Sequence, residues 1–145
     1  MGVDVRTETL IARPLAEVAA YAADPTNAPE WYHNIRSVEW KGEAIVQVGA
    51  RVAFIAQFLG RTLSYTYEVL EYRPNHRMVM RTAEGPFPME TVYEWSEHAD
   101  GTHMRLINRG EPSGFSKLAA PMMARAMRSA NVKDLASLKS ILEAR

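Results

Sequence analysis

The stretch Asp24-Pro25-Thr26-Asn27-Ala28-Pro29-Glu30-Trp31-Tyr32 decides the fold, because it separates a helical segment from a long series of strand-like segments. Residues 14–23 carry apolar side chains at helical spacing, and Asp24-Pro25 ends this helix because the residue before a proline avoids the helical region. Residues 27–31 are expected to add one short helical turn. From Ile35 onward strand signals dominate, and this order predicts an antiparallel sheet that curves around a helix.

Strand signals and turn signals alternate along the rest of the chain. A first strand is expected before the helix, over residues 3–12, and six more are expected over residues 35–40, 51–59, 62–72, 77–82, 89–97 and 102–109. The residue pairs between them are typical of turns, and Asp100-Gly101 is among the strongest short hairpin signals. A long amphipathic segment from about Ser113 to Arg145 closes the chain, so the expected fold class is α+β.

Length and composition predict a single domain, residues 1–145, without strong charge. The 145 residues suffice for one domain with a proper core and are too few for two comfortable ones. Hydrophobic residues make up 47%, which argues against disorder. Lys and Arg number 17, as do Asp and Glu, so no net charge would attract nucleic acid. The same balance weakens repulsion between copies and leaves a homodimer possible.

Several absences in the sequence narrow its chemistry. The chain has no cysteine, which excludes disulfides, thiolate catalysis and thiolate metal sites. No histidines have metal-ligand spacing and no Gly-rich phosphate loop occurs, so neither a metal nor a cofactor is expected. The first ten residues include the charged residues Asp4, Arg6 and Glu8 and contain no long apolar run. We therefore expect neither a signal peptide nor a membrane span, and the cytoplasm is the default location.

Cross-strand pairing predicts that aromatic and apolar side chains share one face of the sheet, because residues directly opposite one another in an antiparallel pair share a face. A turn at Gly60-Arg61 would set Phe54 opposite Tyr67, and the last hairpin would set Trp95 opposite Leu106. The inner face would then hold Phe54, Phe58, Tyr65, Tyr67, Met80, Tyr93, Trp95, Met104 and Leu106, with Asn108 reached by the same alternation.

The strand over residues 77–82 has two possible orientations. A turn at Pro74-Asn75 would direct Met80 inward, opposite Val69. A one-residue slip would instead bring Arg81 into the cavity, where it could bind an enolate or a carboxylate. Apart from that alternative, the middle of the inner wall receives no Asp, Glu, His or Lys, so a group for general acid–base catalysis is not evident.

The last segment has two apolar faces, rotated by roughly 140° from one another at about 100° per residue. The first face consists of Leu118, Met122, Met123, Ala126 and Ala130, and the second of Leu135, Leu138, Ile141 and Leu142. Either the helix bends near Pro121 or Asn131, or it is buried on different sides along its length. The first half, with Met122 and Ala126, is expected to cover a pocket, and the second half is expected to pack on the sheet.

These motifs and their order resemble the SRPBCC superfamily, the START-like or helix-grip proteins, and within it the polyketide cyclase/dehydrase-like branch. The resemblance rests on residues 14–18 (PLAEV), 24–31 (DPTNAPEW), 67–74 (YEVLEYRP), 100–102 (DGT) and 135–139 (LASLK) and covers almost the whole chain. It implies a seven-stranded sheet gripping a long C-terminal helix, with two short helices between the first two strands and a hydrophobic cavity. Family members bind lipids, sterols, polyketides, hormones or quinones, and some catalyse cyclisation or dehydration.

The expected site is this cavity. Trp31 and the inner aromatic residues would contact an apolar, aromatic ligand, and Tyr65, Tyr67, Tyr93 and Asn108 would orient its polar group. The alternative is that these side chains simply fill a core and bond to backbone or trapped water. A dry void of ~300 Å³ would cost ~7 kcal/mol, so a large pocket must hold ligand or water, or the side chains must collapse into it. His33 follows Trp31-Tyr32 near the expected mouth and could serve the site, or it could be a plain surface residue.

Three functions are compatible with this sequence. The first is a protein that binds a small hydrophobic or aromatic molecule, which is lipid-, polyketide- or quinone-like. The second is a cyclase or dehydratase that acts on a polyketide-like substrate in the same cavity. The third is a module that binds a protein partner through an exposed apolar edge.

Overall fold

The structure is a computed structural model that describes residues 2–111 and 119–145. Residues 113–118 of the expected last segment, including Leu118, lie outside the described residues. The seven strands are β1 (Val3–Ile11), β2 (Ile35–Trp40), β3 (Arg51–Phe58), β4 (Arg61–Arg73), β5 (Arg77–Glu84), β6 (Met89–His98) and β7 (Gly101–Gly110). The helices are α1 (Leu15–Ala23), a 3-10 turn (Pro25–Asn27), α2 (Ala28–Trp31) and α3 (Ala120–Glu143).

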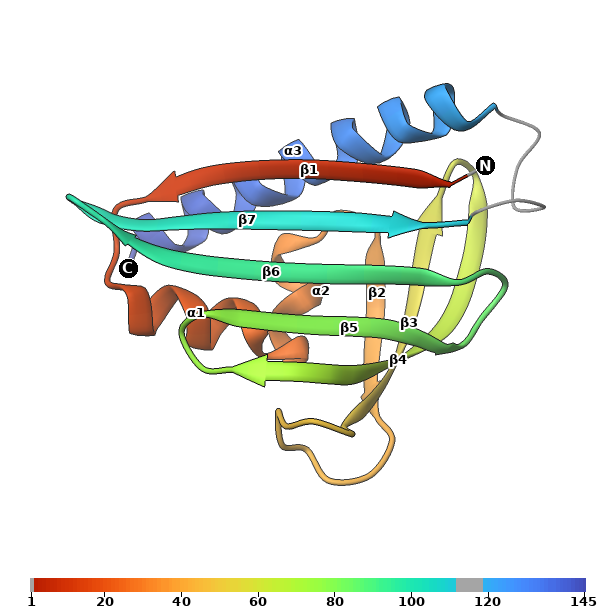
Figure 1. The fold of residues 1–145 in the computed structure, drawn as a ribbon, viewed down its shortest axis with the longest axis horizontal. Helices are drawn as coiled ribbons and strands as arrows, with labels where there is room; N and C mark the ends of the chain where they lie inside the picture. Colours follow the sequence, from red (N-terminus) through yellow and green to blue (C-terminus); the bar gives the residue numbers. More distant parts are fainter. Residues whose placement is uncertain (1, 112–118) are drawn as a thin grey trace.

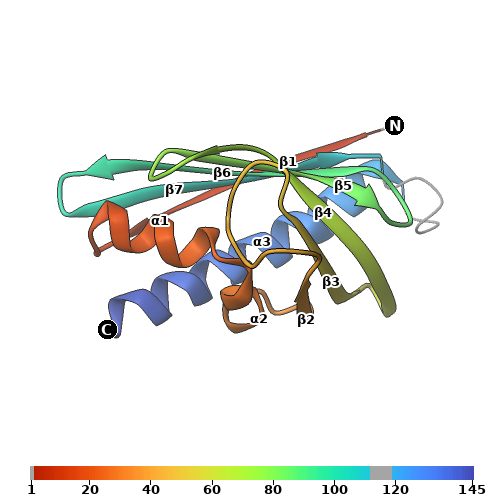
Figure 2. The ribbon, with the colours of Figure 1, turned by 90° about the horizontal axis from the view of Figure 1, so that it is seen from below.

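All seven strands form one antiparallel sheet in the order β1-β7-β6-β5-β4-β3-β2. The sheet curls, so that β2, β3 and the first part of β4 run across the direction of β1, β7 and β6 (Figure 1). Figure 2 shows α3 crossing the concave side of the sheet, with α1 and α2 on that same side. The predicted helix-grip fold, with two short helices between the first two strands, is confirmed.

The strand registers agree with the prediction in one hairpin and differ by two residues in two others. Val69 pairs with Met80 as expected, and Met80 is buried while Arg81 is exposed, so the slipped orientation of β5 is wrong. Phe54, however, pairs with Tyr65 instead of Tyr67. Because side chains alternate with a period of two, a two-residue shift leaves every side chain on its predicted face.

The two register errors have separate physical reasons. Leu59 and Gly60 form the β3–β4 turn with φ values of 51° and 77°, and such a turn favours glycine at its second position rather than its first. In the β6–β7 hairpin, Ala99-Asp100 is the turn, and Trp95 pairs with Met104 instead of Leu106. Gly101 already belongs to β7, where an added Cβ would lie 2.1 Å from the carbonyl oxygen of Ile11. This glycine therefore serves close packing, not the turn.

Helix α3 is continuous and is buried along one stripe. Its buried residues lie on one helical face and are Met123, Asn131, Asp134, Leu135, Leu138 and Leu142. Two of these residues, Asn131 and Asp134, are polar. The prediction considered apolar residues alone, and it therefore divided this single buried stripe into two faces. The second half packs with Trp31, Trp95, Met104 and Leu106 in the main core cluster, as expected.

Candidate functional site

A cavity of about 170 Å³ lies between the concave face of the sheet, the α1–α2 segment and α3. Seven of the residues predicted for the site line it, namely Phe54, Phe58, Tyr65, Tyr67, Met80, Tyr93 and Asn108. Strand alternation explains why these residues share a wall, because they occupy every second position on β3 to β7. The helix side is lined by Met123, Met127, Ala130, Asn131 and Asp134.

Three aromatic rings form one wall, which we call the aromatic wall: Phe54 on β3 with Tyr65 and Tyr67 on β4. The rings of Phe54 and Tyr65 are stacked, with centroids 5.4 Å apart and planes inclined by 26°. Tyr67 meets Phe54 edge-on at 5.9 Å and lies 5.1 Å from Tyr65. Burial raises the pKa of the Tyr65 hydroxyl well above its usual value, so this group is neutral in the cavity.

A hydrogen-bonded chain runs from the aromatic wall to Asn108. The hydroxyl groups of Tyr67 and Thr91 lie 2.9 Å apart, and the Thr91 hydroxyl donates to Oδ1 of Asn108 at 2.7 Å. Because Thr91 has a single hydrogen, the Tyr67 hydroxyl must donate to Thr91. Burial raises the pKa of Tyr67 to about 12, although the bond to Thr91 lowers it. The chain fixes the Asn108 amide with its carbonyl turned toward Thr91.

Tyr32 and Tyr93 form a second hydroxyl pair, with their oxygens 2.6 Å apart. Tyr32 immediately follows α2, and Tyr93 lies on β6, so the bond ties the short helix to the sheet. Burial is the main cause of the raised pKa of both phenols. Only one hydrogen lies between the two oxygens, so the other hydroxyl hydrogen remains for a third partner.

Asp134 is the one carboxyl group among the described residues that line the cavity. Its Oδ1 accepts a hydrogen bond from the backbone N–H of His33 at 3.0 Å and lies 3.0 Å from Nδ1 of the same residue. Asp134 is 2% exposed, whereas the side chain of His33 is 56% exposed. Burial raises the pKa of Asp134, and the contacts with His33 lower it in part.

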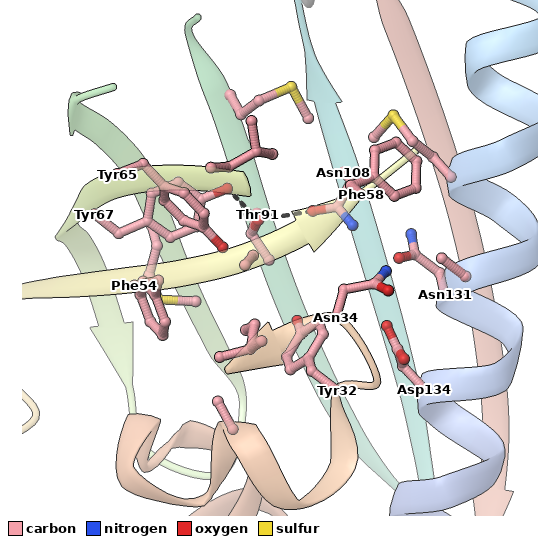
Figure 3. Close-up of a pocket in the computed structure, with 18 of the residues that line it drawn as sticks. Tyr32, Asn34, Phe54, Phe58, Tyr65, Tyr67, Thr91, Asn108, Asn131 and Asp134 are labelled. Carbon is pink, nitrogen blue, oxygen red and sulfur yellow. Dashed lines mark hydrogen bonds between the residues drawn. The ribbon is translucent and has the colours of Figure 1, made fainter. Parts of the chain in front are cut away.

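Asn34, Asn131 and Asp134 gather on the α3 side of the cavity, opposite the aromatic wall (Figure 3). We call these three residues the polar end. Nδ2 of Asn131 is buried and has no hydrogen-bond partner among the described residues. The cavity therefore has an aromatic wall that offers ring contacts and a polar end that offers hydrogen bonds.

The sequence matches the family model for polyketide cyclase / dehydrase and lipid transport over residues 2–143. The chain belongs to this family. No curated protein matches it. The resemblance drawn from the sequence motifs is thus confirmed.

Three solved structures show the same fold as this polyketide cyclase / dehydrase and lipid transport family member. The protein TTHA0849 of Thermus thermophilus is 20% identical, with a TM-score of 0.78 over 94% of each chain. The Zhui aromatase/cyclase of Streptomyces sp. R1128 is 16% identical, with a TM-score of 0.78 over 99% of this chain and 94% of the other. The major latex-like protein 151 of Panax ginseng is 13% identical, with a TM-score of 0.70 over 99% and 96%.

Six other residues proposed for the site do not line the cavity in this family member. Four of them, Trp31, Trp95, Met104 and Leu106, are buried in the main core cluster. The other two are on α3: Met122 is 58% exposed and Ala126 is half-buried. The helical phase is the reason, because the stripe through Asn131 and Asp134 directs Met123 and Met127 inward instead.

Sequence reasoning missed the polar end altogether. The polar groups expected from the sequence lie on strands, whereas Asn131 and Asp134 come from the helix and Asn34 from the segment after α2. A usable signal was present, because Asn131, Asp134, Leu135 and Leu138 have the spacing of one helical face. His33, which the sequence offered as a possible site residue, contacts the site through Asp134.

Within residues 2–111 and 119–145, no group of three or more His, Asp or Glu side chains could hold a metal ion. In the same part of the chain, no helix is both long and apolar enough to cross a membrane.

Proposed function

We propose that this protein binds a small aromatic molecule in the cavity between sheet and α3. The observation that supports the proposal is the cavity itself, about 170 Å³ with the aromatic wall on one side and the polar end on the other. An apolar cavity of roughly 150 Å³ is large enough to bind benzene. The volume therefore suits a ligand of one or two rings, or the ring portion of a lipid-, polyketide- or quinone-like molecule.

The energetic cost of an empty cavity supports a guest as well. At about 24 cal/mol per Å³, a closed and dry void of this size would cost about 4 kcal/mol, a large part of the ~5–15 kcal/mol that stabilises a domain. Because the cavity is partly open, water or a guest occupies it instead. Water can occupy the polar end, where hydrogen-bonding groups are available, but it gains little against the aromatic wall. An aromatic ring would fill the part of the cavity that water fills poorly.

Indole, a neutral two-ring molecule, tests this proposal by calorimetry and thermal unfolding. We expect indole at 100 times its Kd to stabilise the protein by about 2.7 kcal/mol, which raises Tm by several degrees. Ala130→Phe should fill the cavity from α3 and abolish the binding, because Ala130 lines the wall. Ala136→Phe, on the exposed face of the same helix, is the matched control and should bind indole normally. Equal binding by both variants would contradict a site in this cavity.

A second function, proton transfer on a bound carbonyl compound, is favoured by one observation. Asp134 lines the cavity and burial raises its pKa, which is the usual way to prepare a carboxylate as a general base. Solvent exchange of the α-hydrogens of 4-phenyl-2-butanone in D₂O, followed by NMR, tests this role. Exchange that depends on the protein and is lost in Asp134→Asn would support a cyclase- or dehydratase-type enzyme, and exchange at the uncatalysed rate would argue against one.

The remaining expectations stay predictions. These are the cytoplasmic location, the possible homodimer and the individual contribution of each residue proposed for ligand contact. Light scattering of the purified protein would decide the oligomeric state.

A further inference from the structure

The described ionisable side chains that line the cavity can supply negative charge but no positive charge. Its described lining includes one carboxyl group, that of Asp134, and no Lys, Arg or His side chain. The ionisable partner of Asp134 is His33, which reaches it from the exposed side and is charged only when protonated. A negative group in the polar end of the cavity, without a permanent cation beside it, favours a positive guest and disfavours a negative one.

The Asp134 carboxylate has unused hydrogen-bonding capacity on the cavity side. Both contacts with His33 involve the same oxygen, Oδ1. Oδ2 has no partner among the described residues, although a carboxylate can accept about four hydrogen bonds. Burial raises the pKa of Asp134, which shows that the fold leaves this charge incompletely compensated.

Asn131, one helical turn before Asp134, also has unused capacity. It is 5% exposed, lines the cavity, and its Nδ2 is unpartnered within the described part of the chain. The indole N–H groups of Trp31 and Trp95 are unpartnered too, but these side chains belong to the main core and do not line the cavity. Buried polar groups in native proteins are normally satisfied, so Nδ2 of Asn131 points to a polar contact inside the cavity. Because Nδ2 is a donor, an ammonium group would not satisfy it, and the preference for a cation rests on Asp134.

The opposite wall fits the same guest. The faces of aromatic rings carry negative potential, which does not repel a cationic ligand. The described aromatic wall of Phe54, Tyr65 and Tyr67 also contains no positively charged side chain. The position of the wall across the cavity from the polar end, visible in Figure 3, suits a molecule with a ring at one end and a polar group at the other.

We propose that the cavity binds an aromatic amine in its protonated form, with the ring against the aromatic wall and the ammonium group donating hydrogen bonds to Oδ2 of Asp134 and to the amide oxygens of the polar end. This inference rests on the proposed binding of an aromatic ligand and adds the charge of that ligand. It also implies that carboxylate ligands, such as fatty-acid anions, are rejected.

Three probes of matched size separate charge from ring binding: 2-phenylethylamine as the cation, 2-phenylethanol as the neutral form and 3-phenylpropionate as the anion. Calorimetry at pH 7 should show that the wild-type protein binds the amine at least 10-fold more tightly than the alcohol, and the anion more weakly than either. Asp134→Asn keeps the shape and removes the charge, so the ratio of amine to alcohol affinity should fall by 10-fold or more. Asp100→Asn removes the same charge from an exposed turn and should leave the ratio as in the wild type.

The outcomes are distinguishable. Equal affinity for amine and alcohol, tighter binding of the anion, or an unchanged ratio in Asp134→Asn would overturn the charge inference while aromatic binding stands. Failure of all three probes and of indole would overturn the proposed function with it. If Asp134→Asn does not fold, the ranking of the three probes on the wild-type protein still decides the question.

Discussion

At the residue scale, the most consequential side chain is a polar one on an apolar stripe. Asp134 anchors the segment after α2 to α3 through His33 and also faces the cavity. Such a residue costs stability, because burial disfavours the charged carboxylate, and we infer that it is kept for what it binds. Stability and function are thus expected to oppose one another at this position.

Asp134→Asn should make the free protein more stable at neutral pH. The folded state holds the Asp134 proton more tightly than the unfolded state, because burial raises the folded pKa above 3.8. The protonated Asp134 side chain therefore stabilises the folded state fully below its unfolded pKa, and this stabilisation is lost as pH rises through its folded pKa. Asparagine keeps an acceptor for His33 and does not titrate. Urea unfolding from pH 4 to 7 should show a gap in favour of the variant that widens as pH rises; a variant that is less stable at pH 7 would contradict this account.

At the residue scale, Tyr93→Phe should cost about 1 kcal/mol of unfolding free energy. The change removes the hydroxyl pair with Tyr32 but keeps the ring, which is buried against Trp31 and Trp95. Tyr72→Phe is a suitable control, because Tyr72 is also on the sheet, is half-buried and carries a hydroxyl for which no bond is described. Urea unfolding of both variants measures the difference, and an equal cost for the two would show that the Tyr32–Tyr93 bond contributes little.

At the element scale, α3 is held by one stripe rather than two. Leu138 is 0% exposed within the main core cluster, whereas Val132, on the same helix, is 54% exposed. Leu138→Ala should therefore cost about 2–5 kcal/mol, and Val132→Ala less than about 0.5 kcal/mol. Denaturant unfolding of the two variants checks this, and similar costs for both would place the buried face of the helix elsewhere.

The hairpin between β6 and β7 gives a second prediction at the element scale. Gly101→Ala should destabilise the protein by at least about 2 kcal/mol, because its Cβ would meet the backbone oxygen of Ile11, which cannot move without disturbing the end of β1. The neighbouring turn residue Ala99 is exposed, so Ala99→Ser is the control and should be nearly neutral. Thermal unfolding measures both, and a neutral Gly101→Ala would show that the strands separate easily there.

At the scale of the whole molecule, the cavity divides the apolar interior. The main cluster lies around Trp31, Trp95 and α3, and a second cluster lies around Ile35, Val52 and Phe54 on β2 and β3. The lining draws residues from both, such as Met80 from the first and Phe54 from the second. Tyr32 and Tyr67 already pack against both clusters, and a bound ring would add a further link between them.

Amide hydrogen exchange should report this link. With saturating ligand, we expect the amides of β3 and β4 to exchange about 10-fold more slowly, because opening that half of the sheet would then also break ligand contacts. The amides between β1 and β7 should change less, since these strands are held by the main cluster in either state. Slowing that is uniform across the sheet would indicate stabilisation of the whole domain without a local bridge.

The sequence by itself determined the order and type of the elements and, in the β3–β4 and β6–β7 hairpins, the face of the sheet to which the side chains belong. Alternation and turn residues are local properties that survive a two-residue shift in register. Only the tertiary structure decided which inward residues line the cavity and which fill the core, and that α3 presents Asn131 and Asp134 to it. The physical reason is that the division between cavity and core, and the residues that α3 turns toward the cavity, depend on how one helix is rotated and placed against a curved sheet. Asn131 and Asp134 can be recognised as buried only when the elements packed around them are known.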